Sequence, residues 1–246
     1  LLLSGDYYPE TKNVDIDIML NKLRLHILNP YLKGIVSDIR GMGTGTITMK
    51  GNISDPQING SINLQKTAFT VNYINTRYSF THELPIKNNS FLLNNISLYD
   101  SEGNKARIDG FIQSSMFFKQ WYLDFALEAK KLLALHTNPQ DNEYFYGKAY
   151  VAGVMSLQGS TKDLSMKIAL KSQPNSQLFI PLTSGSNISE LGLLSFAERN
   201  KEKKIVYEER PKETIDLSGF ALNFDLELTP DLSGQIIFDP QTGDII

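Results

Sequence analysis

Few residues in this sequence have a chemistry and spacing that could support catalysis, and the first of them form a glycine-rich stretch from Gly41 to Gly45. A dinucleotide-binding loop leads from a strand through its glycines into a helix. This stretch instead follows a predicted helix and precedes a predicted strand. No Lys-Ser or Lys-Thr pair follows it, as a P-loop requires. We therefore interpret it as a connector between a helix and a strand.

The three histidines form no recognisable metal-binding or catalytic motif. His26, His82 and His136 lie far apart in the sequence, none has a partner four residues away, and no HExxH motif occurs. The chain contains no cysteine and no Gly-x-Ser-x-Gly motif. We expect no metal, no cofactor and no catalytic residue, so an enzyme is the least favoured class of function.

Two other groups of residues have both a functional and a structural interpretation. The pairs Asp15/Asp17 and Asp124/Glu128 could act as the two carboxylates of a glycosidase. Each pair lies on the polar side of an alternating segment, which favours a solvated surface. The aromatic residues of MFFKQWY and of 144–150 could stack on sugars, although packing in a core is the favoured interpretation.

Composition excludes two further classes of function. The formal net charge of the 246 residues is -3, and without an excess of Lys and Arg no strong nucleic-acid binding is expected. The densest basic stretch, 199–204, is followed by acidic residues, and we interpret 199–214 as a mobile loop. No run approaches the roughly 20 apolar residues that cross a bilayer, so any membrane anchor is expected outside this sequence.

Apolar residues recur at every second position in many separate stretches, which predicts strands with one dry and one wet face. Antiparallel sheets tolerate one solvated face, so a mainly antiparallel all-β fold is expected. Two stretches depart from this period. A helix of about three turns is predicted from Pro30 to just before Gly41, with Asn29 as its N-cap, and a short amphipathic helix after Ser189. Turns are predicted at the following dipeptides and tripeptides: Asp55-Pro56, Asn59-Gly60, Glu102-Gly103-Asn104, Asp109-Gly110, Gln158-Gly159-Ser160 and Thr242-Gly243-Asp244.

A unit made of an alternating strand, a loop and a second alternating strand occurs at 43–73, at 150–170 and at 217–238. The units share a pattern rather than a sequence, as strand pairs do when one face must stay apolar. We interpret 1–246 as a single elongated, repeat-like β fragment of a larger protein.

Two stretches, GTITMKGNISDPQINGSINLQKTAFTVNYINTRYSF and FLLNNISLYDSEGNKARIDGFI, combine these features in a fixed order. In this order the chain resembles the C-terminal region of the TamB family, the translocation and assembly module subunits of bacterial envelopes in the AsmA-like superfamily, in its Bacteroidetes-type form. The matching positions are Gly45, Gly51, Pro56, Gly60, Asp100, Gly103, Asn104, Ala106, Ile108 and Gly110.

The resemblance implies a long, curled sheet that forms an open apolar trough (β-taco-like) with two short helices. It implies a periplasmic module that conducts phospholipid between the inner and outer membranes or assists outer-membrane protein assembly. Its implied partners are phospholipid acyl chains and an Omp85-type outer-membrane barrel, and the full-length protein would be anchored to the inner membrane. The candidates for the lipid-lining face are Ile47, Met49, Ile62, Leu64, Phe69, Val71, Leu123, Phe125, Ile168, Leu222 and Phe224.

A rival interpretation comes from a different class of function. A structural or carbohydrate-binding β-sandwich of a surface protein would cover the apolar face of each sheet with the other sheet. In that case the same alternating residues would form a closed core rather than a lipid-binding face.

Overall fold

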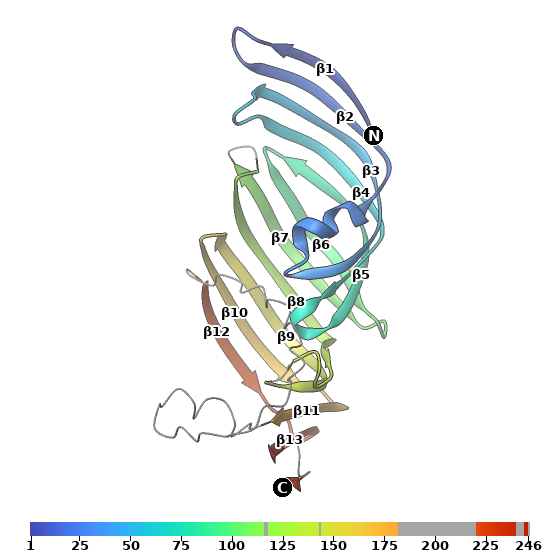
Figure 1. The fold of residues 1–246 in the computed structure, drawn as a ribbon, viewed down its shortest axis with the longest axis vertical. Helices are drawn as coiled ribbons and strands as arrows, with labels where there is room; N and C mark the ends of the chain where they lie inside the picture. The colour runs from blue at the N-terminus through green and yellow to red at the C-terminus, as the bar shows by residue number, and fades with distance from the viewer. Residues whose placement is uncertain (116–117, 143, 182–219, 240–243, 246) are drawn as a thin grey trace, which may run out of the picture.

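The chain folds into one open sheet that does not close into a barrel (Figure 1). The computed structural model describes residues 1–115, 118–142, 144–181, 220–239 and 244–245, and 76% of these residues lie in strands. The all-β prediction is therefore confirmed. The strands are β1 (Leu2–Tyr8), β2 (Asn13–Arg24), β3 (Val36–Asn52), β4 (Gln57–Val71), β5 (Thr76–Lys87), β6 (Ser90–Asp100), β7 (Lys105–Ser115), β8 (Gln120–Thr137), β9 (Tyr146–Ser160), β10 (Asp163–Ser172), β11 (Ser176–Pro181), β12 (Phe220–Glu227), β13 (Leu232–Asp239) and β14 (Asp244–Ile245).

Strands β1 to β9 follow one another in the sheet in chain order, and each pairs antiparallel with the next. Strand β9 is long enough to pair with both β10 and β11 beyond it. Two pairs are parallel, β10 with β12 and β11 with β13. The predicted antiparallel character thus holds for most of a mixed sheet.

The helical segments are shorter than predicted. A 3-10 turn η1 (Leu25–Leu28) leads directly into α1 (Asn29–Leu32), and a second 3-10 turn η2 (Asn72–Ile74) follows β4. The prediction of three helical turns is wrong because β-branched Val36 already lies in β3 and pairs with Val71. Nor is Asn29 an N-cap, since its side-chain Oδ1 accepts a hydrogen bond from the Ile39 N–H at 2.9 Å. The predicted helix after Ser189 and the predicted loop 199–214 lie outside the described residues, as do Thr242 and Gly243 of the last predicted turn.

The stretch from Gly41 to Gly45 is neither a phosphate loop nor a connector, because it lies inside β3. The turn prediction also fails for Asn59-Gly60 and Asp109-Gly110, which lie inside β4 and β7. Gly60 and Gly110 have φ values of 145° and 138°, and a Cβ on either would lie 2.2 Å from a carbonyl oxygen of the adjacent strand. These glycines are therefore required by close approach of two strands rather than by a turn.

The other predicted turns have mixed outcomes. Asp55-Pro56 and Glu102-Gly103-Asn104 do join consecutive strands, β3 to β4 and β6 to β7. Gln158-Gly159-Ser160 instead ends β9, and the turn follows it. Two of the three predicted strand pairs form hairpins, β3 with β4 and β9 with β10. The third is wrong, because β12 and β13 each pair with an earlier strand rather than with each other.

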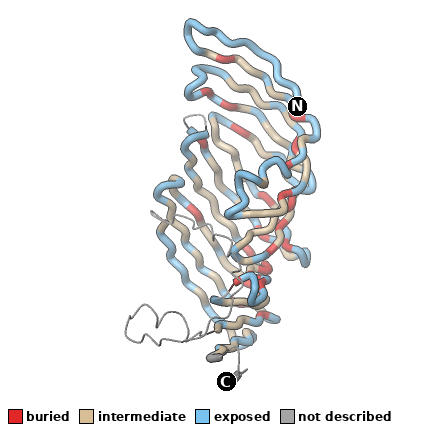
Figure 2. The backbone as a smooth tube through the Cα atoms, viewed as in Figure 1, coloured by how far each residue is buried: buried red, intermediate tan, exposed pale blue. Residues whose placement is uncertain are grey.

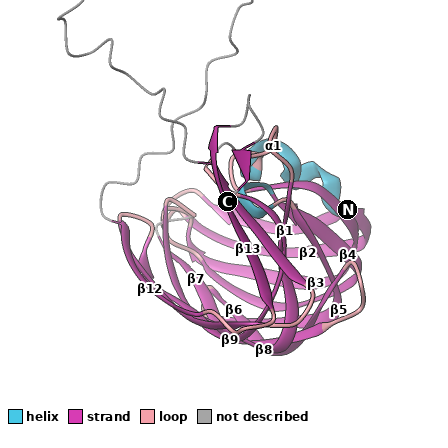
Figure 3. Cartoon of the chain, turned by 90° about the horizontal axis from the view of Figure 1, so that it is seen from below, coloured by secondary structure: helices cyan, strands magenta, loops and turns pink. Residues whose placement is uncertain are grey.

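The strands follow a common curve, as the end-on view in Figure 3 shows. Interruptions of the pairing register coincide with non-glycine residues of positive φ at Lys22, Asp38, Lys66 and Asn95. At three of these bulges the freed backbone N–H donates to a side-chain oxygen of the next strand: Lys22 to Thr44, Lys66 to Thr81 and Asn95 to Asp109. Bulges bend the strand that carries them and increase its twist, so we attribute part of the curvature to these positions.

Candidate functional site

Apolar and glycine residues form an unbroken row across the sheet. Residues that pair directly in adjacent strands point to the same face. The row, from β1 to β12, is Leu3, Ile18, Ile47, Gly60, Ile86, Phe91, Ile112, Leu123, Gly159, Leu164 and Phe220. We name the face that carries this row the inner face and the opposite face the outer face.

All of the predicted lipid-lining residues lie on the inner face. Met49 pairs with Ile16 and Ile58, Ile62 with Gly45 and Leu84, and Leu64 with Gly43 and His82. The remaining candidates belong to parallel rows of the same face: Phe69 and Val71 on β4, Phe125 on β8, Ile168 on β10, and Leu222 and Phe224 on β12. The structure thus places the candidates from five strands on one surface.

The outer face carries polar side chains and ion pairs. Lys50 Nζ lies 3.0 Å from Asp15 Oδ2, and Arg107 contacts Glu128 at 3.0 Å. Asp124 Oδ2 accepts a hydrogen bond from the Gln158 side chain. Members of both predicted carboxylate pairs therefore bond to polar neighbours on the outer face.

None of the candidate residues is fully buried. Nine are half-buried, and Leu222 and Phe224 are each 55% exposed. Figure 2 shows short buried segments scattered among half-buried and exposed ones. In β8, for example, buried Ala129, Leu132 and Leu133 follow the candidates Leu123 and Phe125. Because all described strands belong to one sheet, no second sheet within the described part of the chain covers the inner face. The candidates differ in accessibility, because Phe69 and Val71 pack against buried residues, whereas Leu222 and Phe224 are the most exposed.

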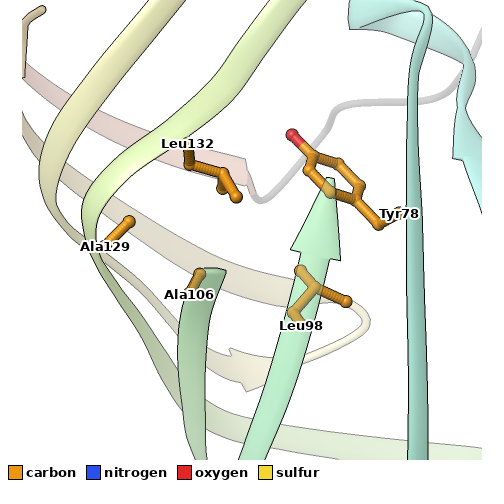
Figure 4. Packing of buried hydrophobic residues seen from close by; sticks show 5 residues of the cluster. All are labelled: Tyr78, Leu98, Ala106, Ala129 and Leu132. Atoms are coloured by element: carbon orange, nitrogen blue, oxygen red, sulfur yellow. The ribbon is translucent and has the colours of Figure 1, made fainter. Parts of the chain in front are cut away.

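The sheet bends toward its inner face between β5 and β8. The Tyr78 side chain projects from the inner face of β5, and its hydroxyl donates a hydrogen bond of 2.9 Å to the Leu133 carbonyl of β8. In a flat sheet, three strand spacings of ~4.8 Å would put β8 beyond the reach of this side chain. The bend encloses a cluster of buried side chains drawn in Figure 4: Tyr78, Leu98, Ala106, Ala129 and Leu132.

Asp100 ties the turn between β6 and β7 to β8. Its carboxylate accepts hydrogen bonds from the backbone N–H groups of Glu102 and Asn104, from the Asn104 side chain and, at 2.7 Å, from the Leu133 N–H. Asp100 is only 5% exposed. Burial favours the neutral acid, but these hydrogen bonds outweigh it and lower the pKa of Asp100.

A second contact joins the same turn to β9. Glu102 forms an ion pair with Lys148 at 2.5 Å and accepts a hydrogen bond from the Tyr150 hydroxyl at 2.5 Å. The hydrogen bond from Lys148, followed by that from Tyr150, lowers the pKa of Glu102. Lys131 Nζ lies over the Tyr150 ring at 4.6 Å from its centroid. Glu102, Lys148, Tyr150 and Lys131 therefore contact one another and join the turn to β9. Their contacts are structural, and they do not line an open site.

The family-motif positions thus have structural roles. Gly103, at φ 86°, and Asn104 complete the turn that Asp100 organises, and Ala106 packs in the buried cluster. Pro56 is fully buried, and its carbonyl accepts a hydrogen bond from the Asn89 side chain. The turn at Asp100 could be expected from its Gly-Asn sequence. Its hydrogen bond to Leu133 could not, because that contact joins residues 33 positions apart.

We expect acid to destabilise the protein partly through Asp100. Its pKa is lowered in the folded state, so its stabilising effect is complete above the ordinary carboxyl pKa of about 3.9 and is lost as the pH falls through the lower folded-state value. Urea unfolding at pH 7, 5 and 3 should show a smaller loss of stability for Asp100→Asn than for the wild type. Parallel losses in both proteins would contradict this assignment.

The structure does not bring the histidines into one site. His82 lies on the inner face of β5, whereas His26 lies in η1 and His136 near the end of β8. Among the described residues, no group of three or more His, Asp or Glu is arranged to hold a metal ion. Of the aromatic residues predicted to pack in a core, Tyr150 is buried but Tyr144 is 71% exposed, so that interpretation is wrong for Tyr144.

In the described part of the chain, no helix has the length and apolar character needed to cross a bilayer. Comparison of the sequence and structure with protein-family models, with curated proteins and with solved structures gives no match. The resemblance to the TamB family therefore remains a prediction based on the motifs quoted above, and the function is argued from the inner face itself.

Proposed function

We propose that this chain is a lipid-binding module whose inner face carries acyl chains along a curved, open sheet. The observation that supports this proposal is the continuous apolar face, whose candidate residues are half-buried or exposed across many strands. A solvent-exposed apolar face of this extent is typical of a site that binds a ligand, a protein partner or a membrane.

The dimensions and energetics suit a lipid. The inner-face row from β1 to β12 crosses 11 strands, which at ~4.8 Å per strand extends over about 50 Å along the sheet. Burying about sixteen methylene groups at ~0.8 kcal/mol each stabilises a bound chain by on the order of 12 kcal/mol before ordering costs. Because the rows repeat from strand to strand, many equivalent positions exist and an acyl chain can slide between them.

The wider role that we propose follows the resemblance to TamB. A periplasmic module of this kind would move phospholipid between the inner and outer membranes, or assist outer-membrane protein assembly together with an Omp85-type barrel. The rival β-sandwich requires two facing sheets, whereas the described strands form one sheet. For that reason we prefer the lipid-binding function.

The test compares two double variants of β4, one with added charge on the inner face and one with the same charge on the outer face. Ile62→Arg with Leu64→Arg puts two cations on the inner face, whereas Asn63→Arg with Gln65→Arg puts them on the outer face one residue along. Native mass spectrometry with lipid extraction should show co-purified phospholipid in the wild type and the outer-face variant. We expect little or none in the inner-face variant.

Circular dichroism should confirm that both variants fold. If the wild type, purified from bacterial cells without detergent, carries no lipid, or if the inner-face variant retains it fully, the proposed function is wrong. In either case the inner face would be better explained as the site of a protein partner.

A further inference from the structure

The sheet is split between β5 and β6. These strands pair at one end through Tyr78 with Asp100 and Ser79 with Tyr99, and at the other through Ile86 with Phe91 and Lys87 with Ser90. No pairs form between 80–85 and 92–98. Both strands remain paired on their other sides, β5 with β4 and β6 with β7, so the split is confined to one ladder.

Two local features account for the split. Asn95 forms the bulge of β6 within the unpaired stretch, which leaves seven residues of β6 opposite six of β5. Pro85, within the unpaired stretch of β5, has no N–H to donate. Backbone groups that face the split therefore lack the ladder partners that they have elsewhere in the sheet, and they are free to bind a ligand or water.

A cavity of about 610 Å³, wide open to solvent, lies at one end of the split, and its lining is mainly hydroxyl groups and one cation. The lining residues are Lys66, Ser79, Phe80, Thr81, Ser97 and Tyr99. Thr81 Oγ1 accepts the hydrogen bond from the Lys66 backbone N–H and keeps its own hydroxyl proton for donation. No acidic side chain of the described residues lines this cavity.

We propose that this cavity binds a phosphate ester, with Lys66 as its charged contact and the hydroxyl groups of Ser79, Thr81, Ser97 and Tyr99 as donors. Phosphate oxygens accept hydrogen bonds, and charge-assisted bonds from an ammonium group are the strong ones. The volume lies within the range of about 300–1,000 Å³ that is typical of small-molecule sites, and it leaves room for the alcohol part of the ester.

The position of the cavity connects it to the proposed lipid site, and this part of the inference rests on the proposed function. Phe80 pairs with Thr67 in an inner-face row and packs against the buried cluster, whereas Ser79 pairs with Tyr99 in an outer-face row. The cavity therefore opens on the outer face, where Ser79, Thr81, Ser97 and Tyr99 lie, and Phe80 lies between it and the buried cluster of the inner face. A phospholipid whose acyl chains lie on the inner face would reach this cavity with its phosphate through the unpaired stretch of the split, between 80–85 and 92–98.

The experiment uses the full chain, isothermal titration calorimetry and three probes. Dihexanoyl phosphatidylglycerol carries chains and phosphate, dihexanoylglycerol carries the chains alone, and glycerol 3-phosphate carries the phosphate alone. We expect Lys66→Glu to weaken binding of the phospholipid about tenfold and to leave dihexanoylglycerol within about twofold. Ser97→Leu fills the cavity without changing charge. It should likewise weaken binding of the phospholipid and leave binding of dihexanoylglycerol within about twofold.

Lys167→Glu is the matched control, because Lys167 is an exposed lysine on the outer face of β10, and it should change the affinity for none of the probes. Affinity for glycerol 3-phosphate that is lost in Lys66→Glu would support the site with a free ester as its ligand. If Lys66→Glu weakens binding of the phospholipid and the wild type does not bind glycerol 3-phosphate, the ligand of the cavity is the phosphate of a lipid headgroup. Unchanged phosphate-dependent binding in both Lys66→Glu and Ser97→Leu would overturn the inference.

The same titrations separate this inference from the proposed function. If the wild type binds dihexanoylglycerol and phosphatidylglycerol equally well, the inner face binds lipid but the phosphate site is wrong. If it binds dihexanoylglycerol not at all, the lipid-binding function fails, and glycerol 3-phosphate alone decides whether the cavity is a phosphate site.

Discussion

Asp100→Ala should lower the free energy of unfolding by about 3 kcal/mol, because it leaves the buried N–H of Leu133 and the turn N–H groups of Glu102 and Asn104 without their acceptor. The lost contacts join β6 to β8, so the effect should reach beyond the turn itself. Urea denaturation followed by circular dichroism measures this difference.

Two variants make the result interpretable. Asp163→Ala removes an exposed carboxylate at the start of β10 and should change the free energy of unfolding by no more than about 0.5 kcal/mol. Asp100→Asn retains one acceptor oxygen and should be intermediate. Equal stability of Asp100→Ala and Asp163→Ala would show that the link from the turn to β8 does not contribute to the fold.

Gly110→Ala should cost about 3 kcal/mol or more and can prevent folding altogether. A Cβ at this position would lie 2.2 Å from the Asp124 carbonyl oxygen and 2.5 Å from the Phe125 Cα, both backbone atoms of β8. The φ of 138° is itself strained for any residue with a side chain. Thermal and urea unfolding should both reveal the loss.

Gly34→Ala is the control for this substitution. No atom outside its chain neighbours lies within 4 Å of a Cβ built on Gly34, and its φ is not in the positive range. We expect a change of no more than about 0.5 kcal/mol. If Gly110→Ala is as stable as Gly34→Ala, then β7 and β8 do not approach each other as closely as described.

The faces of the strands could be predicted because alternation is a property of each strand alone. Ile62 and Leu64 must point to the side opposite Asn63 and Gln65 in any β-strand. For the same reason alternation predicts Asp15 on a polar face, and it lies on the outer face beside Lys50.

Positions where a local preference competes with pairing could not be predicted. Ile35 and Val36 fit a helical spacing, yet Val36 pairs with Val71 of β4 and the Ile35 carbonyl accepts a hydrogen bond from the Asn72 N–H. Asn59-Gly60 has the composition of a tight turn, but a partner strand on each side keeps it extended. In both cases the deciding contacts come from another strand.

Taken alone, the sequence determined that the chain is mainly β and which apolar residues share a face within one uninterrupted alternating segment, because both depend on the period of two along that segment. Leu64 and Phe69 share a face only because of the bulge at Lys66. Only the tertiary structure decided that β12 and β13 add in parallel to β10 and β11, that the sheet bends at Tyr78 and Asp100, and that it splits between β5 and β6. These features depend on which distant strands meet and on the bulges that shift their registers. Such contacts leave no periodic signal in the sequence of either strand.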